Sequence, residues 1–206
     1  MRIRPVGATA LLLEVDEPAA WFAELQRRRD EGEFTADEIV PGAATVLLDG
    51  VTDMAAATEL LRTLQPPSVD AGAARGPVEI TVHFDGPDLA EVARLWETDE
   101  QGVVARLVST EFRVEFCGFA PGWAYLAGLP PELAVPRRRT PRPRVPAGSL
   151  GLADRYAGIY PTASPGGWQL VGATEVTLFD PERDPPALLM PGTRVRFIPS
   201  SSDSQS

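Results

Sequence analysis

Residues 116–129 read FCGFAPGWAYLAGL, and this stretch indicates the fold class of the second half of the chain. A short apolar run leads into a turn rich in Gly and Pro, and a second apolar run follows. Short strands are predicted at 113–117, 175–179 and 194–197, between other loops of the same composition. Many short strands joined by such loops are typical of a β-barrel or a β-sandwich.

Upstream of this stretch the pattern changes to one alternating strand and two helices. Residues 78–84 (VEITVHF) alternate apolar and polar side chains, which predicts a strand. Residues 88–91 (DLAE) and 98–101 (TDEQ) each resemble a capping box, in which an N-cap side chain and a later acidic or amide side chain bond the first helical N–H groups. Two short helices are therefore expected between the strand and residue 112.

The first part of the chain predicts the order strand, strand, helix, strand, strand, helix. Residues 9–15 form an apolar strand, and Asp16 is expected to cap a helix that has Pro18 in its first turn. Strands at 39–40 and 45–48 precede a second helix capped by Thr52 or Asp53. This order predicts a small α+β sandwich in which two helices cover one face of a sheet.

A stretch dominated by Pro, Gly, Ser and Ala separates the two parts. Residues 65–77 read QPPSVDAGAARGP, and hydrophobic periodicity stops there. We therefore predict an α+β domain at 1–65, a linker at 66–77, a β-barrel or β-sandwich domain at 78–199 and a disordered tail at 200–206.

Composition excludes several classes of site. The 206 residues contain one Cys and one His, so a disulfide within the chain and metal sites built on several Cys or His side chains are not expected. The chain has no lysine, which rules out a P-loop lysine and a Schiff-base lysine. The sole histidine, His83, is expected to pack at a strand surface, and Cys117 is expected to act as a small buried hydrophobic residue.

Charge and hydropathy bear on partners and location. The net charge of -10 argues against a nucleic acid partner, because phosphate binding needs a basic surface. No apolar run approaches the ~20 residues that a membrane-spanning helix needs. The apolar run at 11–13 is too short for a signal peptide, so a cytoplasmic location is expected.

Residues 118–123 (GFAPGW) admit two interpretations. Glycine permits close backbone approach to a ligand and the aromatic rings supply apolar walls, so Phe119, Pro121, Gly122 and Trp123 are candidates for a substrate cleft. The alternative is a tight barrel corner in which Gly and Pro fix the backbone dihedrals and the aromatic rings fill the core.

A basic block follows at 137–144. Arg142 and Arg144 alternate along an extended segment, so both are expected on one side, where a guanidinium binds a carboxylate or phosphate through two hydrogen bonds. A solvated loop or a patch that docks an acidic partner is the alternative. Residues 137–139 (RRR) are assigned to that alternative.

Other candidates lie in residues 146–168. Ser149 and Ser164 offer hydroxyls to a polar ligand, but neither is in a nucleophile elbow, so turn capping is the alternative for both. Tyr160 and Trp168 are core residues with polar tips, or walls of the same cleft as Gly166.

Three motifs together resemble one protein family. They are 116–129, 140–149 (TPRPRVPAGS) and 158–172 (GIYPTASPGGWQLVG), and they resemble the family of 5-oxoprolinase subunits that includes KipI and is also labelled allophanate hydrolase subunit 1 or carboxyltransferase domain. The resemblance implies a small α+β domain followed by a cyclophilin-like β-barrel. It also implies a hetero-oligomer with a different 5-oxoprolinase subunit, which has a similar barrel.

The resemblance implies a function in two versions. The first is one subunit of an ATP-dependent hydrolase that opens 5-oxoproline to glutamate, with ATP bound on the companion subunit or at an interface and little activity in this chain alone. The second is a KipI-like inhibitor of a sensor histidine kinase, using an exposed apolar patch near Phe119, Trp123 and Trp168 that is rimmed by arginines. The allophanate label is disfavoured, because Ser-Ser-Lys amidase chemistry needs a lysine.

One family feature is missing. Family members carry a histidine just before the first motif, whereas residues 105–112 read ARLVSTEF. Glu111 is the only carboxylate that this segment offers as a catalytic base, and no metal site is expected.

Overall fold

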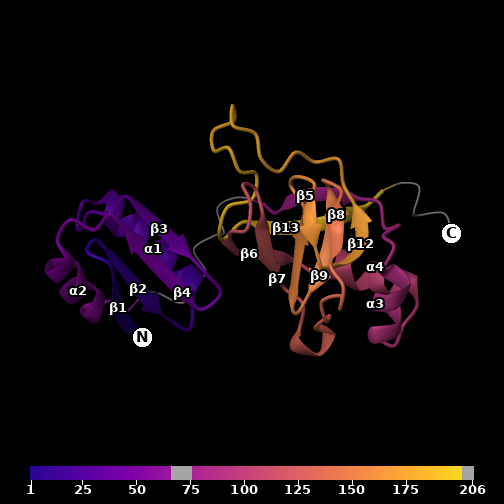
Figure 1. The fold of residues 1–206 in the computed structure, drawn as a ribbon, viewed down its shortest axis with the longest axis horizontal. Helices are drawn as coiled ribbons and strands as arrows, with labels where there is room; N and C mark the ends of the chain where they lie inside the picture. The colour runs from indigo at the N-terminus through magenta and orange to yellow at the C-terminus, as the bar shows by residue number, and fades with distance from the viewer. Residues whose placement is uncertain (66–75, 201–206) are drawn as a thin grey trace. The chain divides into compact units, whose positions relative to one another are not determined.

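The structure, a computed structural model, describes residues 1–65 and 76–200. Most of the predicted linker and all but Ser200 of the predicted tail therefore lie outside the described residues. The chain divides into two compact units, Met1–Ala74 and Arg75–Ser206, and each is described by itself (Figure 1).

The first unit follows the predicted order of elements. They are β1 (Arg2–Val6), β2 (Ala10–Glu14), α1 (Pro18–Asp30), β3 (Glu38–Pro41), β4 (Thr45–Asp49) and α2 (Met54–Thr63). The strands form an antiparallel sheet in the order β1-β2-β4-β3. Leu13 and Val46 of this sheet share one core with Leu25 of α1 and Leu61 of α2, so both helices pack on the same face.

Helix starts in this unit agree in part with the prediction. The Asp53 carboxylate accepts hydrogen bonds from the N–H groups of Ala55 and Ala56, as expected of a cap. The predicted Asp16 cap is wrong, because Glu17 occupies the N-cap position of α1 and makes no side-chain cap bond. Pro18, with its fixed φ and no N–H to satisfy, starts this helix without one.

The second unit is a β-barrel with two helices. Its elements are β5 (Val78–Val82), α3 (Leu89–Leu95), α4 (Glu100–Ser109), β6 (Phe112–Cys117), β7 (Ala124–Ala127), a 3₁₀ turn (Pro131–Leu133), β8 (Arg142–Val145), β9 (Ser149–Ala153), β10 (Tyr156–Ile159), β11 (Ser164–Gly166), β12 (Gln169–Ala173) and β13 (Arg194–Pro199). Seven strands form one sheet in the order β12-β9-β10-β7-β6-β13-β5, and β8 pairs with β11 in a separate two-stranded sheet. All pairs are antiparallel except β13 with β5.

A pair of hydrogen bonds brings the two edges of the seven-stranded sheet together. His83, just after β5, and Ala173, at the end of β12, each donate a backbone N–H to the carbonyl oxygen of the other at 2.8 Å. This bridge nearly closes the sheet into the predicted barrel.

The barrel strands separate two apolar clusters by the alternation of their side chains. Leu126 of β7 and Ala157 of β10 point into the barrel core, whereas Tyr125 and Tyr156 of the same strands belong to an aromatic cluster on the outer face. Every residue of β9 and β10 is buried, because both faces of these strands are covered. They therefore lack the alternation of apolar and polar residues that identifies a half-exposed strand in a sequence.

Two local predictions in this unit are wrong. Residues 175–179 are not a strand: residues 174–193 form a loop in which Phe179 and Ala187 make an isolated bridge. Asp88 precedes α3 as predicted but makes no side-chain cap bond, because its carboxylate binds other partners. The start of α4 is shifted by one residue from the predicted capping box, because the N-cap is Asp99 rather than Thr98, and its carboxylate accepts a hydrogen bond from the Gly102 N–H at 2.7 Å.

Candidate functional site

Aromatic rings from three separate segments cover the outer face of the barrel. Trp123 precedes β7, Tyr160 follows β10 and Trp168 precedes β12, and all three side chains are buried. The Trp123 ring packs edge to face on Tyr160, with 4.7 Å between centroids, and on Trp168 at 5.0 Å. Edge-to-face packing at these distances favours one orientation of each ring.

Two glycines make room for these rings. A Cβ atom on Gly158 of β10 would lie 3.0 Å from Trp123 and 3.1 Å from Trp168. A Cβ atom on Gly166 of β11 would lie 2.1 Å from the Tyr160 hydroxyl oxygen. Because neither glycine has a positive φ, close packing rather than backbone conformation requires them.

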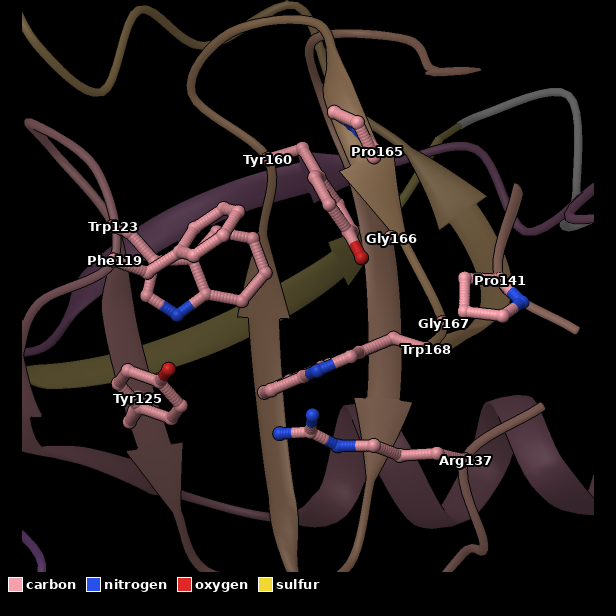
Figure 2. A pocket seen from close by; sticks show the side chains of 10 residues that line it. All are labelled: Phe119, Trp123, Tyr125, Arg137, Pro141, Tyr160, Pro165, Gly166, Gly167 and Trp168. Carbon is pink, nitrogen blue, oxygen red and sulfur yellow. The ribbon is translucent and has the colours of Figure 1, made fainter. Parts of the chain in front are cut away.

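The aromatic rings border a pocket of about 300 Å³ (Figure 2). Its ten lining residues are Phe119, Trp123, Tyr125, Arg137, Pro141, Tyr160, Pro165, Gly166, Gly167 and Trp168. In Figure 2 the Arg137 guanidinium extends beside the Trp168 indole, and Trp123 and Tyr125 lie opposite. Arg137 is the only charged residue in this lining set, so the pocket combines apolar walls with a single cation.

Phe119 forms the exposed rim of the pocket. Its side chain is 65% exposed, its ring lies 5.3 Å from that of Trp123, and its φ is 70°. A bulky residue with positive φ is strained, and such strain is held only where the surrounding structure imposes it. Here the tight turn that ends at Gly122, whose φ is 81°, imposes it.

Hydrogen bonds attach the segment that carries Arg137 to the start of β12. The Arg138 N–H donates to the Gly167 carbonyl oxygen at 2.8 Å, and the Gln169 side-chain amide donates to the Pro136 carbonyl oxygen at 3.2 Å. These bonds flank Arg137 on both sides and place its side chain at the pocket.

A buried carboxylate, that of Asp88, also anchors the segment that carries Arg137. The Asp88 side chain accepts hydrogen bonds from Arg138 and Arg142, each at 2.8 Å, and from the Leu170 N–H at 2.7 Å. Desolvation opposes ionisation of Asp88, but the bonds from Arg142 and Leu170 and the charges of both guanidiniums lower the pKa below its ordinary value. Asp88 is therefore an ionised anchor between α3, β8 and β12.

The pocket offers hydrogen-bond donors and no carboxylate among its lining residues. The Trp123 Nε1 atom is buried and has no hydrogen-bond partner within the described part of the chain. Burial raises the pKa of Tyr160, against a backbone hydrogen bond with Trp168 and the charges of Arg137 and Arg142, so its hydroxyl stays protonated near neutral pH. An anionic or carbonyl-bearing ligand suits this arrangement.

The structure brings some of the predicted site residues together and leaves others apart. Those in the lining are Phe119, Trp123, Tyr160, Gly166 and Trp168. Those outside it are Pro121, Gly122, Arg142, Arg144, Ser149, Ser164 and Glu111. Ser149 is buried in β9 and Ser164 lies in β11, where its hydroxyl has no partner among residues 1–65 and 76–200.

Two of the residues outside the lining are engaged in ion pairs. Arg142 binds Asp88, and Glu111 pairs with Arg196 at 2.7 Å and Arg194 at 3.5 Å. The hydrogen bond from Arg196 lowers the pKa of Glu111, which weakens it as a proton acceptor. The Glu111 carboxylate therefore has a structural role, because it pairs with two arginines of β13 at the surface.

The predicted exposed patch at Phe119, Trp123 and Trp168 is wrong in two of its three members. Trp123 is 2% exposed and Trp168 is 5% exposed, because their indole rings pack against each other in the pocket wall. Among the three, Phe119 alone presents its ring to solvent.

Sequence reasoning missed Tyr125, Arg137, Pro141, Pro165 and Gly167, which all line the pocket. Tyr125 alternates with the core-facing residues of β7, so the period of two in that strand could have placed its ring on the outer face. Arg137 had no such signal, because it is the first of three consecutive arginines with the same local setting.

The sole histidine and the sole cysteine lie elsewhere. His83 makes the barrel-closing bridge and lies beside a second, smaller pocket with Thr81 and Glu175. Burial raises the pKa of the Cys117 thiol to about 11, which agrees with a packing role rather than a nucleophilic one. No group of three or more His, Cys, Asp or Glu side chains able to hold a metal ion occurs in the described residues.

None of the helices in the described part of the chain is both long enough and apolar enough to span a membrane.

Comparisons with known proteins place the chain in a family. The family described as carboxyltransferase domain, subdomain C and D matches residues 1–189. A protein named as a 5-oxoprolinase subunit, from Escherichia coli O157:H7, is 41% identical over 206 residues, which cover 94% of each chain. Another of that name from Haemophilus influenzae is 35% identical over 207 residues, covering 96% of this chain and 97% of its own.

Solved structures agree with this placement. The structure of TTHA0988 superposes with a TM-score of 0.78 at 34% identity, and the match covers 97% of this chain but 40% of that longer one. The urea amidolyase of K. lactis shares the fold, with a TM-score of 0.68 at 19% identity over 15% of its length. The chain belongs to the carboxyltransferase domain, subdomain C and D family.

Proposed function

We propose that this chain is one subunit of an ATP-dependent hydrolase of the 5-oxoprolinase type, which converts 5-oxoproline to glutamate. The observation that carries the proposal is the near end-to-end similarity to two proteins named as 5-oxoprolinase subunits. The pocket on the outer face of the barrel is the substrate site in this proposal.

The chemistry of the pocket supports a small cyclic acid as the substrate. Arg137 supplies one cation for a carboxylate, and a charge-assisted bond from a guanidinium is among the stronger hydrogen bonds. Trp123, Tyr160 and Trp168 supply apolar walls for a five-membered ring. A volume of about 300 Å³ suits a small metabolite, at the lower end of ligand pockets.

Opening a lactam also needs activation and a proton acceptor. The lining set contains no carboxylate and no histidine, and Glu111 is bound to Arg194 and Arg196. We therefore assign the base to the companion 5-oxoprolinase subunit of a hetero-oligomer and infer that this chain alone is inactive.

ATP would supply the free energy, but the described residues do not fit a nucleoside triphosphate. The chain has no lysine, and the pocket holds one guanidinium among aromatic and Gly/Pro walls. We assign ATP to the companion subunit or to the interface with it and derive no step through it on this chain.

The test is co-expression with the companion subunit, purification of the complex, and an assay of ATP-dependent glutamate release from 5-oxoproline. We expect release by the complex and none by this chain alone. Arg137→Ala should weaken 5-oxoproline binding at least ~10-fold, because it removes a hydrogen bond to a charged group.

Arg139→Ala is the matched control, since it removes a guanidinium two residues away that does not line the pocket. Equal losses in both variants would contradict the role of Arg137. A stable complex without glutamate release would contradict the substrate, and failure to form a complex would favour the kinase-inhibitor alternative.

A further inference from the structure

The indole N–H of Trp123 is a buried donor in the wall of the pocket. Trp123 is 2% exposed, and its Nε1 atom has no hydrogen-bond partner in the parts of the chain that the structure describes. Buried polar groups in folded proteins are nearly always hydrogen-bonded, because an unpaired buried donor loses its hydrogen bonds to water and gains none in exchange. A buried donor without a partner in a pocket wall is therefore a candidate for hydrogen bonding to a ligand.

The donor is aimed at the pocket. In Figure 2 the nitrogen of Trp123 lies on the edge of the ring that faces Tyr125 and Trp168 across the pocket. The Trp96 indole provides a contrast in the same unit, since it is also buried but donates to the Leu133 carbonyl oxygen at 3.0 Å. The structure thus satisfies the Trp96 donor with a backbone carbonyl and leaves the Trp123 donor directed at the pocket.

The packing fixes the direction of the donor. The Trp123 ring contacts Tyr160, Trp168 and Tyr125 edge to face, and a Cβ on Gly158 would touch it at 3.0 Å. A ring held by neighbours on several sides cannot rotate its N–H away when a ligand arrives. Because the Nε1 atom is closed to solvent in this conformation, a ligand oxygen reaches it only when a neighbouring side chain of the pocket wall moves, while the packed ring keeps the direction of the N–H.

We propose that Trp123 is a specificity-determining residue, whose indole N–H donates a hydrogen bond to the carbonyl oxygen of a cyclic amide while Arg137 binds the carboxylate. This proposal rests on the proposed function, which places the substrate in this pocket. The neutral, buried donor matches the neutral carbonyl, and the charged guanidinium matches the carboxylate. A cyclic amino acid without the carbonyl, such as proline, leaves the donor unpaired and is rejected.

The test uses the full chain and follows the indole N–H signals of its four tryptophans by NMR during titration. The probes are 5-oxoproline, proline and 6-oxopiperidine-2-carboxylate, a six-membered analogue. We expect the Trp123 indole proton to move downfield with the two amides and not with proline. Trp123→Phe, which keeps an aromatic ring and removes the N–H, should weaken 5-oxoproline binding ~10-fold, the effect of one hydrogen bond.

Trp96→Phe is the matched control, because it removes a buried indole N–H that already has a partner. It should lower stability and leave the affinity for 5-oxoproline unchanged. The signal of the wild-type chain needs no variant, so the test stands even if Trp123→Phe folds poorly.

The outcomes separate the two proposals. Binding of 5-oxoproline with no movement of the Trp123 signal and no loss in Trp123→Phe overturns the donor role and leaves the proposed function in place. Movement of the signal with the six-membered amide but no binding of 5-oxoproline supports the donor role and overturns the 5-oxoprolinase assignment. No binding of either amide to the chain or to its complex with the companion subunit overturns both.

Discussion

Asp88 joins three segments that are far apart in the chain. Its carboxylate binds the side chains of Arg138 and Arg142 and the backbone of Leu170. Its own N–H donates to the Leu170 carbonyl oxygen at 2.9 Å, so the residue also extends the contact with β12. One buried carboxylate thereby fixes the walls on which Arg137 and Trp168 lie.

Asp88→Ala should therefore lower the free energy of unfolding by about 3 kcal/mol, because it leaves two guanidiniums without their buried partner. Urea unfolding at pH 7 measures this change. Glu91→Ala is the control, since Glu91 pairs with Arg94 on the exposed side of α3, where solvent screens the ion pair and its loss should change stability little. Equal effects of the two substitutions would contradict the anchoring role.

Asp88 should also make stability depend on pH. Its pKa in the folded protein is lowered from the ordinary value of 3.8. The stabilisation is therefore complete only well above pH 3.8, and it is lost as the pH falls past 3.8 and through the lower pKa of the folded state. The difference in unfolding free energy between the wild type and Asp88→Ala should shrink between about pH 5 and pH 2; a difference that stays constant over this range would contradict the prediction.

The elements around the pocket depend on how closely β10 and β11 approach the aromatic rings. Gly166 and Gly167 are neighbours in the sequence, yet a Cβ on Gly166 would lie 2.1 Å from the Tyr160 hydroxyl and one on Gly167 would lie 3.7 Å from its nearest atom. Tyr160 is 1% exposed, so it has little space into which to move.

Gly166→Ala should consequently lower stability by about 1–3 kcal/mol, the usual effect of overpacking a core. Gly167→Ala should change stability by less than ~0.5 kcal/mol, because its added methyl makes ordinary contacts. Thermal unfolding followed by circular dichroism compares the two variants. Similar melting temperatures would show that Tyr160 shifts easily and that the pocket wall is softer than its packing indicates.

Closure of the barrel as a whole depends on the bridge between His83 and Ala173. A Cβ on Gly172 would lie 2.4 Å from the His83 carbonyl oxygen and 2.9 Å from the Val82 side chain. A backbone oxygen cannot move aside as the end of a flexible side chain does. A side chain at position 172 therefore conflicts with closure itself.

Gly172→Ala should open this edge and cost on the order of 3 kcal/mol, at the upper end of the overpacking range. Hydrogen exchange at the His83 and Ala173 amides is the direct measurement, and both should exchange faster in the variant. Gly118→Ala is the control for stability, since a Cβ there meets nothing within 4 Å. Unchanged exchange at both amides would show that the barrel closes without this bridge.

Features that depend on nearby residues could be predicted from the amino-acid sequence alone. Local capping, periodicity and turn chemistry predicted the Asp53 cap, a helix that starts within a residue of Asp99, and the element order of the first unit. They also predicted a second unit of short strands, as a barrel or a sandwich, and the family resemblance then selected the barrel. The motifs at 116–129, 140–149 and 158–172 carried enough specific detail to indicate the family, and the absence of lysine limited the chemistry. These properties need only a few neighbouring residues, which is why they were accessible.

Which side chains meet became clear only from the folded chain. Arg137 and Arg142 lie in the same basic block, but one lines the pocket and the other is bound to Asp88, which lies 54 residues away from it. The strands β9 and β10 could not be predicted from an alternation of apolar and polar residues, because both of their faces are buried. Burial and pairing depend on segments that are distant in sequence, and a local pattern does not encode the position of a distant partner.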